Sequence, residues 1–248
     1  MNQLHELLVI LHIVFGSVAL ALFWVPAIAR KGSKIHVSAG RYYVRAMTVV
    51  VVSALIASIM VLVDPIGIRH PGVEMTPEDI ERRSESYRMF SLFLLMLSVL
   101  VYATLRHGVV ALRARTDPAA LSALPHKATT FVLGGLGAVV GAWGLLQVQP
   151  LLVFFAAISL FASISMYREC RLENPTRNDL LRMHFGGLIG SGIGAHTAFF
   201  AFGGSHFLGN VLPGQWQLLP WILPSVVGIL INRRLDRRYE NPVPESAG

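Results

Sequence analysis

The feature that most constrains this chain is a series of long apolar segments separated by short charged stretches. Seven segments approach the roughly 20 residues that a helix needs to cross the hydrocarbon core of a bilayer. They are residues 7–29, 43–63, 89–112, 128–147, 151–167, 183–203 and 217–232. Charged residues make up 14% of the chain, against about 25% in a soluble domain. The sequence therefore predicts an all-α fold, a single domain of seven transmembrane helices over residues 1–238.

The distribution of Lys and Arg predicts the orientation of this bundle. All but four of the 21 Lys and Arg residues lie in the first, third and fifth connections or after the last segment, and those four lie between residues 64 and 88. Basic residues near span ends stay in the cytoplasm. We therefore expect the N-terminus outside and the C-terminus inside, in the inner membrane of a bacterium. Ala27-Ile28-Ala29 resembles a signal cleavage site, but no basic region precedes it, so we expect the first helix to be retained.

Two connections and the C-terminal tail allow further predictions. Residues 64–88 form an extracytoplasmic loop, in which Thr76 followed by Pro77 predicts the start of a short surface helix. The fourth and fifth segments are joined by only Val148, Gln149 and Pro150, so they should form a tight antiparallel hairpin. Residues 239–248 are polar and predict a disordered cytoplasmic tail.

Glycine recurs at helical spacing on the fourth and sixth segments. The residues are Gly134, Gly137, Gly141, Gly144, Gly186, Gly190 and Gly194. Small residues mark the faces where membrane helices approach closely. We expect these two helices to pack tightly in the middle of the bundle, although a bare glycine face would also accommodate a flat porphyrin or quinone ring.

Histidine is the only ionisable residue type that the sequence offers as a candidate within the apolar segments, because their middles contain no Asp, Glu or Lys. At a rise of about 1.5 Å per residue, His12 and His196 lie at matching depth, roughly 8–10 Å below the outer boundary. Other histidines fall at helix ends on the cytoplasmic side and form a second layer: His36, His107, His126 and His184.

Three roles compete for these histidines. A pair at one depth on facing helices could ligate a six-coordinate haem b, and two layers would carry an electron across the bilayer. A cluster could instead hold zinc, but no HExxH or HxxxH spacing occurs. The third role is structural, a hydrogen bond to a neighbouring polar group. The single cysteine, Cys170, excludes an intrachain disulfide, and we expect neither a cysteine zinc site nor a cysteine-attached haem.

The basic stretch before the second segment predicts contact with anions. His36, Arg41 and Arg45 lie at the cytoplasmic membrane boundary, where such clusters bind anionic lipid headgroups. The same residues could instead face a haem propionate or a substrate phosphate.

Two motifs resemble an uncharacterised family of predicted bacterial membrane proteins, a domain of unknown function. They are His36-Val37-Ser38-Ala39-Gly40-Arg41-Tyr42-Tyr43-Val44 with Met47, and His184-Phe185-Gly186-Gly187-Leu188-Ile189-Gly190-Ser191 running on to Thr197-Ala198-Phe199. The resemblance implies a similar fold and compartment over most of the chain, and it draws attention to His36 and His184. It does not require His196. Helical-bundle cytochromes b are a more distant analogy, because their paired histidines on two helices are not reproduced.

The leading functional prediction is a membrane redox or cofactor-binding protein that uses haem b or quinone. Its predicted ligands are His12, His196, His36 and His184, with Arg41 and Arg45 beside them. The alternatives are a small-molecule transporter or permease and, third, a zinc-dependent membrane hydrolase. A pI near 10.1 does not indicate nucleic-acid binding, because the basic residues flank apolar segments instead of covering a polar surface.

Overall fold

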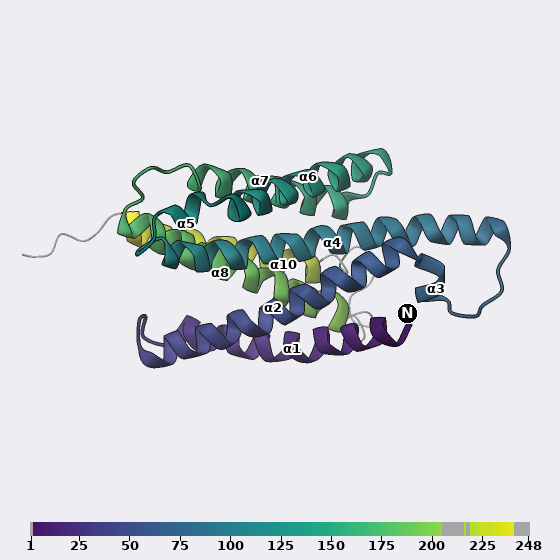
Figure 1. The fold of residues 1–248 in the computed structure, drawn as a ribbon, viewed down its shortest axis with the longest axis horizontal. Coiled ribbons are helices and arrows are strands. Elements are labelled where there is room, and N and C mark those ends of the chain that lie inside the picture. The colour runs from purple at the N-terminus through teal and green to yellow at the C-terminus, as the bar shows by residue number, and fades with distance from the viewer. Residues whose placement is uncertain (1, 205–215, 217–218, 241–248) are drawn as a thin grey trace, which may run out of the picture. The chain divides into compact units, whose positions relative to one another are not determined.

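The computed structural model describes residues 2–204, 216 and 219–240, and their only regular secondary structure is helical (Figure 1). Among these described residues, six helices are long and apolar enough to cross a membrane. They are α1 (Asn2–Ile28), α2 (Lys34–Val63), α4 (Pro77–Arg113), α6 (Leu124–Leu146), α7 (Pro150–Glu169) and α8 (Arg177–Ala198), the last continued by the π-helical turn η1 (Phe199–Gly203). The chain is therefore that of a multi-pass membrane protein.

Helix α10 (Leu219–Glu240) contains residues 219–232 of the predicted seventh segment, 217–232, and residues 217–218 lie outside the described residues. It is not among the six, because its apolar part is short and runs directly into Arg233 and Arg234. The number of seven spans and the orientation of the termini thus stay predictions. Most of the predicted tail, residues 241–248, lies outside the described residues.

The chain divides into two compact units, and α4, α6 and α7 contribute residues to both. The first unit comprises residues 1–102 and 129–165, and the second comprises residues 103–128 and 166–248. The expectation of one domain over residues 1–238 is not tested by this division.

In the first unit, a tight turn joins α1 to α2, and the two helices pack along each other. Gly32 adopts a positive φ of 77° there, which costs glycine little because it lacks Cβ. Ser33 caps α2 by accepting a hydrogen bond from the backbone N–H of His36. Helix α2 begins nine residues before the predicted span at residue 43, so its first turns carry the basic stretch.

The connection over residues 64–88 differs from the expected one. A helical turn, α3 (Pro65–Arg69), is capped by Asp64, and α4 begins at Pro77 with Thr76 accepting from the N–H of Asp79. The expected short surface helix starts at this position but continues without a break into the third span. Residues 78–88 contain neither glycine nor proline, so nothing in them ends the helix.

Helices α6 and α7 form the hairpin that the three-residue connection predicts (Figure 1). Val148 turns the chain with a φ of 52°, and the N–H of Gln149 donates to the carbonyl of Gly144. A Cβ at Gly144 would lie 2.9 Å from Cβ of Leu152. The glycines Gly134, Gly137 and Gly141 likewise face α7, so this seam lets the two backbones approach closely.

In the second unit, the end of α4 packs against α8. A Cβ at Gly187 would lie 2.5 Å from the carbonyl oxygen of Thr104 and 2.8 Å from Cα of Gly108, whereas Gly186 has nothing within 4 Å. Gly190 also faces Thr104. The contact face of α8 therefore runs through Gly187 and Gly190 and leaves Gly186 to one side. A small apolar core closes this region and consists of Val110, Ala111, Ala114, Leu121, Leu180 and Met183.

Candidate metal centre

Three chain segments of the second unit end close together and each contributes one potential metal ligand. His107 lies two turns before the end of α4, and His126 lies in the first turn of α6. The connection between them contains the helical turn α5 (Ala119–Ser122) and reverses the chain, so the two histidines meet. Cys170 follows the last residue of α7 and closes its final turn by donating its N–H to Met166.

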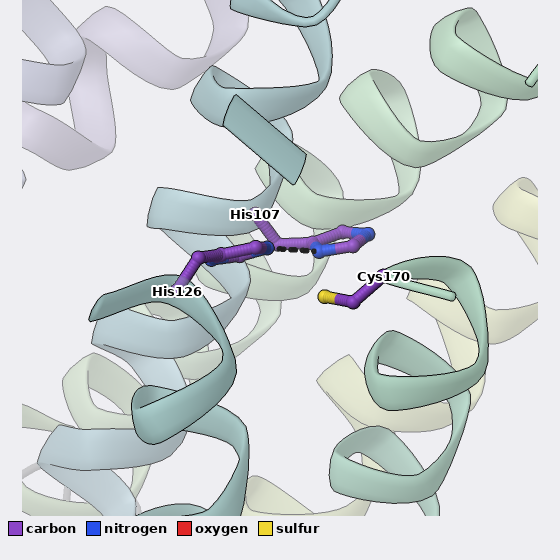
Figure 2. Close-up of side chains that lie close together, drawn as sticks. All are labelled: His107, His126 and Cys170. Carbon is purple, nitrogen blue, oxygen red and sulfur yellow. Dashed lines mark hydrogen bonds between the residues drawn. The ribbon is translucent and has the colours of Figure 1, made fainter. Parts of the chain in front are cut away.

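The three side chains form a compact and buried group. One donor atom from each of His107, His126 and Cys170 lies within 4.8 Å of the other two. The residues are only 3%, 1% and 2% exposed. Nδ1 of His107 and Nε2 of His126 are 3.1 Å apart, their rings are stacked at 22°, and the sulfur of Cys170 points toward them (Figure 2).

Glu169 provides a carboxylate at the edge of this group. Its Oε2 lies 2.7 Å from Nε2 of His107, although the angle is outside hydrogen-bond geometry. The side chain of Glu169 is 34% exposed, so it has room to rotate into alignment. A carboxylate that accepts from the second nitrogen of a ligating histidine is the usual outer shell of a metal site.

Several polar atoms at the group are buried without a hydrogen-bond partner among the described residues. They include Nδ1 of His126 and Nε of Arg106. Buried polar atoms in proteins are nearly always satisfied, and each exception needs an explanation. Nε2 of His126 shares a hydrogen bond with Nδ1 of His107, whereas its Nδ1 has no partner among the described residues.

The thiol of Cys170 is neutral at physiological pH. Burial and the neighbouring carboxylate of Glu169 raise the pKa of Cys170 to about 11, and the charge of Lys127 opposes this only in part. A metal ion that uses this sulfur must therefore displace its proton.

The four histidines that the sequence selects as ligands share a different environment. Each hydrogen-bonds a backbone carbonyl through Nδ1, at 2.7–3.0 Å: His12 to Val50, His36 to Pro26, His184 to Gly108 and His196 to Gly192. Within the described residues, the group of possible metal ligands includes none of them. His12 and His196 belong to different units, and their pairing around a haem stays a prediction.

Sequence reasoning places His107 and His126 in the cytoplasmic layer but does not select them, and it discounts a cysteine site. A mixed site with one cysteine and two histidines is a possibility that this reasoning overlooks. The available signal is that His107, His126 and Cys170 all lie near span ends in connections predicted on the same side of the membrane. Counting donors by membrane side, instead of by depth within a span, would find them.

Comparison of the chain with protein-family models, with curated proteins and with solved structures finds no match. The resemblance of the two short motifs to a family of unknown function therefore stays a prediction, and the geometry of the site carries the functional argument.

Proposed function

We propose that this chain is a zinc-binding membrane protein whose centre is formed by His107, His126 and Cys170. The observation that carries the proposal is that these three donors converge within 4.8 Å in a buried place. Two nitrogens bound to one tetrahedral zinc lie about 3.3 Å apart, given Zn–N distances near 2.05 Å. The 3.1 Å between Nδ1 of His107 and Nε2 of His126 is close to that separation.

The charges at the site support a divalent ion. A Cys170 thiolate and the Glu169 carboxylate carry two negative charges, and the histidines bind a metal in their neutral form. A divalent cation would offset these two negative charges, in addition to the nearby positive charges of Arg106 and Lys127, and burial makes an uncompensated charge costly. Two imidazoles and one thiolate suit zinc better than they suit magnesium or calcium, which take oxygen ligands.

The proposed roles follow from the contacts. Nδ1 of His107, Nε2 of His126 and Sγ of Cys170 bind the ion, while Glu169 orients His107 through Nε2. Three protein ligands leave a fourth position for water or a substrate atom, as in catalytic zinc sites. This arrangement favours the zinc-dependent hydrolase among the alternatives over the transporter.

The test is the metal content and the metal spectrum of the full-length protein purified in detergent. We expect about one zinc per chain, and Co²⁺ in its place should show thiolate charge-transfer bands and the intense d–d bands of a tetrahedral ion. His107→Ala, His126→Ala and Cys170→Ser should abolish binding. Glu169→Gln should weaken affinity by about 10- to 100-fold, as for other outer-shell carboxylates.

His36→Ala is the matched control, because it removes a histidine predicted on the same membrane side and should leave metal binding unchanged. Absence of stoichiometric zinc or cobalt binding, or equal binding by the Cys170→Ser variant, would refute the proposal. Equal size-exclusion profiles of the variants establish that loss of metal is not loss of fold.

Haem b with His12 as an axial ligand is the second candidate. What favours it is the hydrogen bond from Nδ1 of His12 to Val50, because it makes Nε2 the basic nitrogen that iron would use. A Soret band in the same preparation that disappears in His12→Ala would establish this candidate. A colourless protein would end it.

A further inference from the structure

We infer that the first turns of α2 bind the phosphate of an anionic phospholipid, at a site separate from the metal centre. A concavity of about 490 Å³ opens here in the first unit. Three cationic side chains line it, from Lys34, Arg41 and Arg45, together with Ser38 and Tyr42.

The cationic residues share one helix face. Lys34, Arg41 and Arg45 are separated by seven and four residues, which places them on a single stripe of α2. All three are exposed, and among the described residues none forms an ion pair with a carboxylate. The guanidinium of Arg45 lies over the ring of Tyr42 at 5.8 Å, a contact that holds it beside the concavity. The stripe therefore presents positive charge without a partner of its own.

The same face of α2 becomes apolar where the cationic part ends. Val52, Ile56, Ile59 and Val63 continue the stripe at helical spacing and are 47%, 40%, 49% and 71% exposed. A phospholipid has this polarity, with a charged headgroup followed by acyl chains. Free phosphate matches only the first half of the surface, so the whole stripe fits a lipid.

The depth of the site agrees with this partner. Arg45 lies just inside the predicted second span, and Lys34 lies about 16 Å further along the helix axis, at a rise of about 1.5 Å per residue. Long basic side chains at such a boundary extend to lipid phosphates, and Tyr42 is of the type enriched at membrane interfaces. The predicted side is cytoplasmic, where anionic lipids attract basic segments.

The experiment is a lipid-retention measurement on the full-length protein by native mass spectrometry from detergent. One arm adds phosphatidylglycerol, a second adds zwitterionic phosphatidylcholine and a third adds inorganic phosphate as competitor. Wild-type protein should retain phosphatidylglycerol in preference to phosphatidylcholine, and free phosphate should not displace it. Each basic residue near an anionic surface contributes about a fivefold change in binding, so Arg41→Gln/Arg45→Gln should lower retention by about 30-fold.

Two variants control for charge and for folding. Arg113→Gln/Arg115→Gln removes the same charge from exposed arginines elsewhere on the predicted cytoplasmic side and should retain the lipid. Arg41→Lys/Arg45→Lys keeps the charge and should retain most of it. Unchanged retention by the Arg41→Gln/Arg45→Gln variant, or displacement of the lipid by inorganic phosphate, would overturn the inference. Neither result depends on the metal centre, since zinc content is measured separately.

Discussion

Cys170 is the only cysteine of the chain, and its surroundings decide what its sulfur can do. It is 2% exposed and lies next to the carboxylate of Glu169, so its pKa rises to about 11 and the thiol is a poor nucleophile at neutral pH. A bound divalent cation reverses this preference, because it replaces the proton and offsets the negative charge of Glu169. In the proposed centre, a metal ion therefore competes with the proton of the Cys170 thiol.

This competition predicts that metal affinity rises with pH. From about pH 7 to about pH 9 the Cys170 thiol still holds its proton, so binding one Zn²⁺ through its sulfur releases that proton and the affinity should rise about tenfold per unit of pH. The measurement is a Co²⁺ titration followed by absorbance, with proton release recorded by an indicator dye. An affinity that does not change with pH over this range would show that the sulfur is not a ligand.

Helices in this protein pack closely where glycine allows two backbones to approach each other. Replacing one such glycine by alanine adds a single methyl group and so tests this packing. Gly187→Ala places a Cβ 2.5 Å from the Thr104 carbonyl and 2.6 Å from the amide nitrogen of Gly108, and these are backbone atoms that cannot rotate away. We expect the free energy of unfolding to fall by about 2 kcal/mol or more, as in other overpacked sites. Thermal unfolding of the detergent-solubilised protein measures the change.

Gly186→Ala is the matched control for that substitution. It lies one residue earlier on the same helix, and nothing is within 4 Å of the added Cβ. The alanine should leave the protein unchanged or stabilise it by up to about 1 kcal/mol through its helix propensity. Equal destabilisation by both variants would contradict the packing face assigned to α8.

Because Gly108 follows His107 directly, Gly187→Ala should also weaken metal binding.

Helix boundaries show what a local pattern can and cannot predict. The apolar runs locate α1, α2, α4, α6, α7 and α8, since a helix satisfies its own backbone hydrogen bonds in lipid. They miss the nine residues by which α2 extends beyond its apolar part and the continuity of α4 through residues 77–88. These polar turns carry no hydropathy signal, and only the absence of helix-breaking residues indicates that the helix continues.

The whole molecule is predicted to cross the membrane an odd number of times. Reporter fusions after Pro118 and Glu173 should be active on the cytoplasmic side, a fusion at Val148 should be active outside, and a fusion after Glu240 should be cytoplasmic. The physical reason is the concentration of Lys and Arg in the first, third and fifth connections. A C-terminal reporter outside would mean that α10 does not span, and would leave six crossings.

The sequence by itself determined that the chain is helical and that its helices are long and apolar enough to cross a membrane, because the length and polarity of each segment are local properties. It also placed His107 and His126 in one layer by depth. Only the tertiary structure decided that these two meet Cys170, and that His12, His36, His184 and His196 each bond a backbone carbonyl. Depth is one coordinate along a helix, whereas a metal site needs the rotation of each helix and the path of each connection, which arise from packing between segments distant in the sequence.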